Sequence, residues 1–135
     1  MIQRIQTLWL LLASACSSAT LFFPFYTGNK DNNLFIEINA KSHFLLLILC
    51  VAVILSTVLA IFFYKNRKKQ MLIVAVSLVL QILNIVFFLY QTKSFIQGAI
   101  SFSALFTFTV PVFLMLALLG IRKDEKLIQS MDRLR

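Results

Sequence analysis

Four stretches of this chain run for about 20 residues each without any Asp, Glu, Lys or Arg. They cover residues 5–26, 43–64, 71–90 and 99–121. A helix needs about 20 apolar residues to cross a hydrocarbon core about 30 Å thick. In lipid each backbone N–H and C=O must find its partner within the segment, so helices are the expected form. The sequence therefore predicts an all-α membrane protein with four transmembrane helices.

Composition and aromatic residues support these spans. The chain is 60% hydrophobic and only 13% charged, whereas about a quarter of the residues of a soluble domain are charged. Trp and Tyr prefer the headgroup level of a bilayer. Tyr26, Tyr64 and Tyr90 each end a stretch, and Trp9 lies near the start of the first. The boundaries of the predicted spans thus coincide with residues typical of a membrane interface.

The net charge of +8 is unevenly distributed. Ten basic residues fall on one side of the predicted spans: Arg4, Lys65, Arg67, Lys68, Lys69, Arg122, Lys123, Lys126, Arg133 and Arg135. The other side has three, Lys30, Lys41 and Lys93. Because basic residues in short loops stay in the cytoplasm, we expect an up-down bundle with both termini cytoplasmic, oriented chiefly by Arg4 and the 65–69 loop. Membrane lipids are the expected electrostatic partner, and no nucleic acid is expected.

The chain between the spans is short, so we expect one membrane domain over residues 1–135. An outer loop covers residues 27–42, a cytoplasmic loop residues 65–70 and a cytoplasmic tail residues 122–135. Within the outer loop, "LFIEIN" alternates well enough for a short strand or a segment lying on the interface. The second outer connection, "QTKSFIQG", is predicted to be a bare turn. The loops leave no room for a soluble module.

The first stretch has a second interpretation as a cleaved lipoprotein signal. Arg4 precedes an apolar core, Ala13 to Ala15 form an A-x-A site, and Cys16 follows. The sequence after Cys16 remains apolar, however, whereas a lipoprotein would continue into a polar tether. We therefore expect the first stretch to be retained as a span.

Three polar residues share one face of the third span. Ser77, Gln81 and Asn84 are four and three residues apart. Polar side chains within a membrane are costly, so such a face is a candidate site for an ion or a polar substrate. The alternative is interhelical hydrogen bonding that holds the bundle together, and we favour it. The spans contain no acidic residue to relay protons.

Pro111 lies in the middle of the fourth span. Proline has no N–H, so the carbonyl of Thr107, four residues earlier, loses its helical partner and a kink is expected. The hydroxyl of Thr107 or Thr109 could satisfy that carbonyl locally.

The motifs of known catalytic and metal sites are missing from the sequence. It contains no HExxH, no GxSxG, no Gly-rich phosphate loop and no pair of intramembrane aspartates. Cys16 and Cys50 lie within apolar segments, where cysteine behaves as a small hydrophobic residue. We expect no enzyme activity, no cofactor and no metal site.

The tail, "IRKDEKLIQSMDRLR", contrasts with the rest of the chain. At helical spacing Leu127, Ile128, Met131 and Leu134 fall on one stripe, which predicts an amphipathic helix continuing from, or hinged to, the fourth span. Such a helix could lie on lipid, bind a protein groove or be a solvated retention signal. Its three acids favour a protein partner. The predicted docking residues are Arg122, Lys123, Asp124, Glu125, Leu127, Ile128, Met131, Asp132, Arg133, Leu134 and Arg135.

Three segments carry a resemblance to a known family. The opening "MIQRIQTLWLLLA", the internal "FFYKNRKKQM" and the closing "IRKDEKLIQSMDRLR" resemble the bacterial membrane-protein family named domain of unknown function 4293, found in Bacteroidota. The resemblance covers essentially the whole chain. It implies a four-helix inner-membrane protein with cytoplasmic termini, and it implies no activity.

Together these features predict a non-enzymatic accessory or assembly subunit of an inner-membrane complex. The tail would dock it to an inner-membrane or cytoplasmic partner, with protein translocation and envelope biogenesis machinery as candidates. The alternative is a small transporter or lipid-handling protein that uses the face of Ser77, Gln81 and Asn84.

Overall fold

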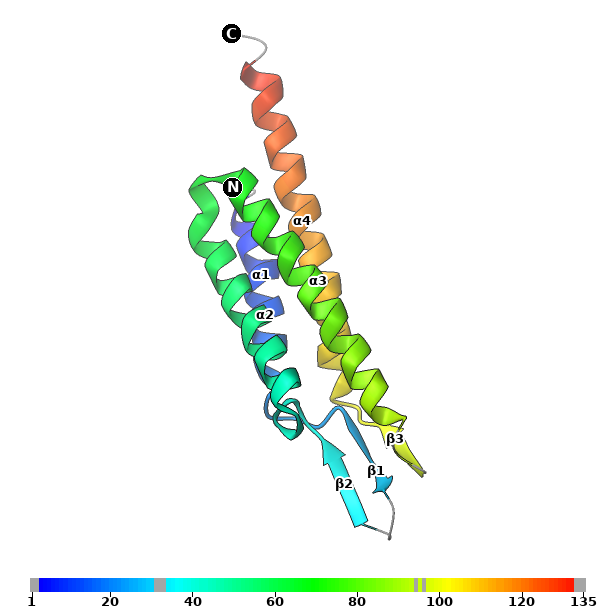
Figure 1. Cartoon of the computed structure of the whole chain (residues 1–135). Helices are drawn as coiled ribbons and strands as arrows, with labels where there is room; N and C mark the ends of the chain where they lie inside the picture. The colour runs from blue at the N-terminus through cyan, green and yellow to red at the C-terminus, as the bar shows by residue number, and fades with distance from the viewer. Residues whose placement is uncertain (1–2, 31–33, 94, 96, 133–135) are drawn as a thin grey trace.

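The computed structural model describes residues 3–30, 34–93, 95 and 97–132. These residues form four α-helices and a small sheet (Figure 1). The helices are α1 (Gln3–Ala19), α2 (Phe44–Phe62), α3 (Arg67–Thr92) and α4 (Ala104–Asp132). The strands are β1 (Tyr26–Lys30), β2 (Leu34–Ile38) and β3 (Gln97–Ile100). Two 3₁₀ turns, η1 (Ala40–Ser42) and η2 (Phe63–Lys65), flank α2.

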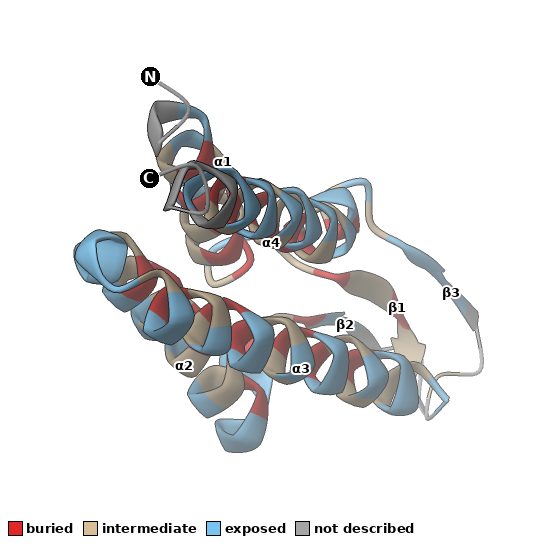
Figure 2. Ribbon diagram, turned by 90° about the horizontal axis from the view of Figure 1, so that it is seen from above, coloured by how far each residue is buried: buried red, intermediate tan, exposed pale blue. Residues whose placement is uncertain are grey.

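The four helices alternate in direction and pack side by side (Figure 1). Each contacts the next along the chain, and α1 also contacts α4. Figure 2 shows that the buried residues lie on the sides of the helices that face one another. We call the end at which α1 and α3 begin the basic end, because the loop cations lie there. The opposite end, which carries the strands, is the sheet end.

Three of the helices are long and apolar enough to cross a membrane. They are α2 with η2 (Phe44–Lys65), α3 and the Ala104–Ile128 part of α4. The apolar part of α1, Ile5–Ala19, is shorter. Large apolar side chains such as Leu55, Val86 and Met115 are exposed on the outer faces. A continuous apolar exterior of this kind is typical of a bundle whose solvent is lipid.

The helix bounds differ from the predicted spans in three places. Residues 5–26 are not one helix: α1 ends at Ala19, and Tyr26 already belongs to β1. The fourth helix begins at Ala104 rather than residue 99, because residues 97–100 pair in the sheet. The third begins at Arg67 rather than residue 71, since the Asn66 side chain caps it by accepting from the Lys69 N–H. Most of the predicted 65–70 loop is therefore helical.

The sheet is antiparallel with strand order β2, β1, β3. The alternating "LFIEIN" segment was predicted to be either a short strand or a segment lying on the interface. It contains strand β2. The prediction of a bare turn at "QTKSFIQG" is wrong, because Gln97–Ile100 pairs with β1. Gly98 permits this pairing: a Cβ there would lie 2.6 Å from the Tyr26 ring and 2.8 Å from the Thr27 carbonyl oxygen.

The sheet end closes over its own apolar cluster. Phe25 and Ile38 from the sheet region are buried against Leu46 of α2 and Phe88 of α3. The Phe25 and Phe88 rings stack with their centroids 4.5 Å apart. A second cluster, built from all four helices, fills the rest of the bundle. The sheet is thus packed onto the helices rather than attached by a loose loop.

Candidate functional site

The tail is a direct continuation of α4. The helix runs from Ala104 to Asp132 with Pro111 inside it, so the predicted tail has no hinge up to residue 132. Residues 122–132, which we call the arm, have a helical length of about 16 Å. Figure 1 shows α4 extending past the other helices at the basic end. The arm is therefore held in line with the bundle.

Asp124 faces the bundle and not solvent. Its side chain is only 5% exposed, and the Gln6 Nε2 of α1 donates a hydrogen bond to its Oδ2. Gly120, one turn earlier on α4, makes room for Gln6: a Cβ there would lie 3.0 Å from the Gln6 Cγ. Asp124, which the sequence placed among the docking residues, is therefore buried and ties the base of the arm to α1.

Two apolar residues of the predicted stripe remain exposed on the arm. Leu127 is 43% exposed and Ile128 is 37% exposed. Arg122, Lys123 and Lys126 are also exposed, and Glu125 is half-buried. The side chains of the other predicted docking residues lie outside the described part of the structure: Met131, Asp132, Arg133, Leu134 and Arg135.

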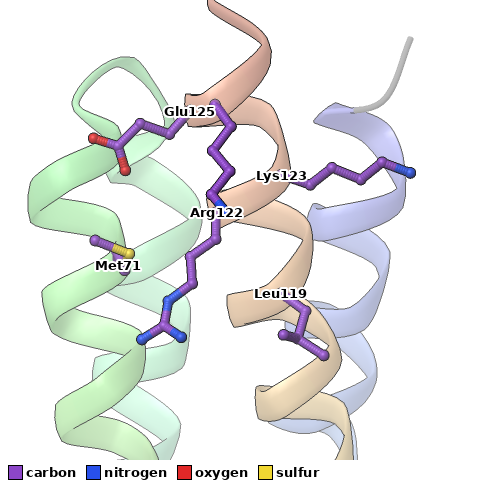
Figure 3. Close-up of a pocket in the computed structure, with 6 residues that line it drawn as sticks. Met71, Leu119, Arg122, Lys123 and Glu125 are labelled. Carbon is purple, nitrogen blue, oxygen red and sulfur yellow. The ribbon is translucent and has the colours of Figure 1, made fainter. Parts of the chain in front are cut away.

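Two grooves flank the base of the arm. The first, which we call the α3–α4 groove, has a volume of about 570 Å³ and is shown in Figure 3. It is lined by Met71, Leu119, Arg122, Lys123, Glu125 and Lys126. The second, which we call the loop groove, has a volume of about 400 Å³. It is lined by Lys65, Asn66, Arg67, Lys68, Glu125 and Ile128.

Three of the predicted topology residues therefore line the loop groove: Lys65, Arg67 and Lys68. Lys69 is exposed and belongs to neither groove lining, while the side chain of Arg4 lies outside the described residues. The arm and the loop thus come together at the basic end, with Ile128 beside three cations. The charge pattern predicted the tail and the loop on the same side of the spans, but it did not indicate that they share a groove.

Ser77, Gln81 and Asn84 are buried on one side of α3. Each contacts a different residue on a neighbouring helix, two on α2 and one on α4. The Ser77 Oγ lies 2.8 Å from the Ser56 Oγ of α2, and the Gln81 Nε2 donates to the Thr107 carbonyl of α4 at 3.0 Å. Asn84 donates from Nδ2 to the Cys50 Sγ at 3.0 Å. These contacts link α3 to both of its neighbours.

Gln81 provides a hydrogen-bond donor for the backbone carbonyl that Pro111 leaves without a helical partner. Pro111 cannot donate to the Thr107 carbonyl oxygen, and the Gln81 amide takes the place of the missing N–H. The Thr109 hydroxyl donates to Phe106 instead, at 2.9 Å. The carbonyl is thus satisfied by a neighbouring helix and not by Thr109.

Cys50 joins a polar cluster within the bundle that the sequence had not indicated. Besides accepting from Asn84, its Sγ lies 3.7 Å from the Oγ1 of Thr20, the residue that follows α1. The Asn84 Oδ1 and the Ser17 Oγ are buried and have no hydrogen-bond partner among the described residues. Cys50 lies four residues after buried Leu46, so its spacing was the available signal that it faces inward.

No group of three or more His, Cys, Asp or Glu side chains positioned to hold a metal occurs in the described part of the chain.

Comparisons with known proteins identify a family but no individual relative. Neither the curated proteins nor the solved structures gave a match to this chain. One family model matches residues 2–134, nearly the full length. The chain therefore belongs to the family described as domain of unknown function 4293, DUF4293.

Proposed function

We propose that this chain is a non-enzymatic accessory or assembly subunit of a bacterial inner-membrane complex, and that the arm docks it to a protein partner. One observation carries the proposal: α4 continues as one helix from an apolar span into an arm that presents exposed Leu127 and Ile128. The Gln6–Asp124 contact holds the base of this arm in place. An apolar pair on a pre-organised helix is suited to binding in a protein groove.

The proposal includes a topology in which all four helices cross the membrane and both termini lie in the cytoplasm. The distribution of cations supports it, because the loop residues and the basic residues of the arm gather at the same end of the bundle. The apolar helix of α1 is followed by exposed Phe22 and Phe23, which add apolar surface towards the sheet end. Both features fit a bundle immersed in lipid with its basic end inside.

The docking surface combines the arm with the loop groove. Ile128 lines this groove together with Lys65, Arg67 and Lys68, and Glu125 is the acid among its lining residues. A matching partner segment would carry an apolar residue flanked by acidic ones, so that burial and charge both contribute. Subunits of protein translocation or envelope biogenesis machinery are the candidate partners.

The contacts of the polar face favour this proposal over a transporter or a lipid-handling protein. Ser77, Gln81 and Asn84 make separate bonds to side chains or backbone of α2 and α4. Interhelical bonds of this kind stabilise membrane bundles by about 0.6 to 2 kcal/mol each. A transport site would instead need several of these groups to point at one ligand.

A purification in mild detergent tests the docking proposal. We expect Ile128→Ser to reduce the amount of the co-purifying partner, and removal of residues 126–135 to abolish it. Ile36→Ser is the matched control, because Ile36 is equally apolar and 38% exposed but lies on β2 at the sheet end. Partner recovery that is the same for Ile128→Ser, the truncated chain and Ile36→Ser would refute docking through the arm.

A further inference from the structure

We propose that the α3–α4 groove binds the headgroup of one anionic phospholipid, at a site distinct from the loop groove. This inference does not depend on the proposed protein docking. It starts from one face of α4. Val112, Met115 and Leu119 are exposed at spacings of three and four, and Arg122 and Lys126 continue the same face. The face therefore changes from apolar to basic along the helix, as a phospholipid does from tail to headgroup.

The groove lies at the level where this change occurs. Its lining takes Met71 from the second turn of α3 and Leu119 from the apolar part of α4, together with charged residues from the next turns of α4. α3 begins at Arg67, so the groove is at the end of the apolar spans. Headgroup phosphates lie at this depth in a bilayer. A lipid phosphate in the groove would leave its acyl chains on the exposed surface of Leu119, Met115 and Leu72.

The charges of the groove suit a phosphate. Figure 3 shows the Arg122 side chain lying between α4 and α3, whereas Lys123 points away from α3. Arg122 and Lys126 are thus the cations we assign to the site, and Glu125 is the acid in its lining. The guanidinium group can bind two phosphate oxygens at once, and the ammonium group adds a second positive charge. Glu125 opposes an anion and lowers the affinity of the site.

The apolar residues that line the groove favour a lipid over a free anion. Met71 and Leu119 form the apolar part of the lining, and neither offers a hydrogen bond to inorganic phosphate. A groove volume of about 570 Å³ is in the range of small-molecule sites. A molecule with an anionic head and an apolar body can contact both the cations and the apolar residues of the lining.

Native mass spectrometry of the full chain purified in detergent tests this site. Phosphatidylglycerol and phosphatidylcholine are added separately, and the fraction of protein carrying one lipid is measured. We expect one phosphatidylglycerol to be retained preferentially. The double variant Arg122→Gln/Lys126→Gln should weaken its binding by about 30-fold, which corresponds to about 2 kcal/mol for two basic side chains.

The matched control is Lys68→Gln/Lys69→Gln. It removes the same charge at the same end, but neither residue lines the α3–α4 groove. We expect it to leave phosphatidylglycerol binding nearly unchanged. Equal losses in the two double variants would show diffuse attraction only and would overturn the site. Equal binding of phosphatidylcholine would overturn the role of the headgroup charge.

A second variant keeps the test decisive if the double substitution prevents folding. Glu125→Gln removes the opposing acid, so it should strengthen phosphatidylglycerol binding and leave phosphatidylcholine unaffected. Weaker or unchanged phosphatidylglycerol binding would count against the site. Glycerol 3-phosphate, which has the anion but no acyl chains, should not displace the bound lipid; displacement at equal concentration would assign the groove to free phosphates instead.

Discussion

Single residues show how this bundle accommodates groups that are costly in lipid. Pro111 leaves the Thr107 carbonyl without its helical donor, and Gln81 supplies one from α3. An unpaired carbonyl in an apolar interior costs about 1 to 3 kcal/mol. The position of Gln81 on a buried polar face was predictable from its spacing to Ser77 and Asn84. Its partner was not, because the sequence does not specify the register between α3 and α4.

We expect Gln81→Leu to lower the free energy of unfolding by about 1 to 3 kcal/mol, since the Thr107 carbonyl loses its donor. In a Pro111→Ala background the loss should be clearly smaller, because residue 111 then supplies a backbone N–H. Denaturant unfolding in detergent of the four chains of this double-mutant cycle measures the coupling. Equal losses of unfolding free energy in the two backgrounds would show that Gln81 does not compensate for the N–H that Pro111 lacks.

The hydrogen bond between Gln6 and Asp124 ties the base of the arm to the bundle. Asp124 follows buried Ala117 and Ile121 at spacings of seven and three, so it continues the inward face of α4. That spacing could have shown that Asp124 faces inward. The sequence could not identify Gln6 as its partner, because α1 and α4 are the two ends of the chain.

Asp124→Ala should loosen the base of the arm, whereas Asp124→Asn should not. The asparagine side chain keeps an oxygen that can accept from the Gln6 Nε2. We expect amide hydrogen exchange in residues 121–128 to rise about tenfold in Asp124→Ala, as for the loss of about 1.4 kcal/mol. Asp124→Asn should stay close to the unmodified chain. Similar exchange in Asp124→Ala and the unmodified chain would mean that the contact contributes nothing to the arm.

At the scale of elements, the helices were more predictable than the strands. Helices are local, so the charge-free stretches located all four helices, although α1 ends at Ala19 and not at residue 26. The sheet joins β1 to β3, which are separated by α2 and α3. Such pairing depends on contacts between distant segments, and "QTKSFIQG" has too little alternation to indicate a strand. Gly98 was the one local sign of a close backbone approach.

We expect Gly98→Ala to destabilise the sheet end, because the added Cβ would collide with the Tyr26 ring and the Thr27 carbonyl. A loss of about 1 to 3 kcal/mol is typical of such overpacking. Ala99→Ser, at the exposed neighbouring position of β3, is the control and should have little effect. Thermal unfolding and hydrogen exchange at Tyr26 and Thr27 provide the readout. Identical behaviour of the two variants would contradict the pairing of β3 with β1.

At the scale of the whole molecule, one end gathers the cations and the arm, and the other carries the sheet. Charge distribution in the sequence was sufficient to predict that the loop and the tail lie on the same side of the spans. It could not show the grooves, which depend on how α3 and α4 pack. Charge distribution also could not show that the predicted docking residues divide between the interior, where Asp124 lies, and the exposed surface of the arm.

The orientation of the bundle can be tested by cysteine labelling. With Cys16 and Cys50 replaced by Ser, a cysteine is introduced at Lys69 on the basic end or at Glu37 on β2, both exposed. We expect a membrane-impermeant maleimide to label Glu37→Cys in intact spheroplasts and Lys69→Cys only after permeabilisation. The reverse pattern would place the basic end outside the cytoplasm.

Photo-crosslinking in intact cells tests most directly whether the arm docks to a protein. A photoreactive amino acid replaces Ile128 on the arm, or Met115 on the lipid-facing side of α4 as the comparison. We predict a protein adduct of one size at position 128, absent at position 115, whose partner is the protein lost from the Ile128→Ser purification. Adducts only to lipid at position 128, or the same adducts at both positions, would contradict docking through the arm.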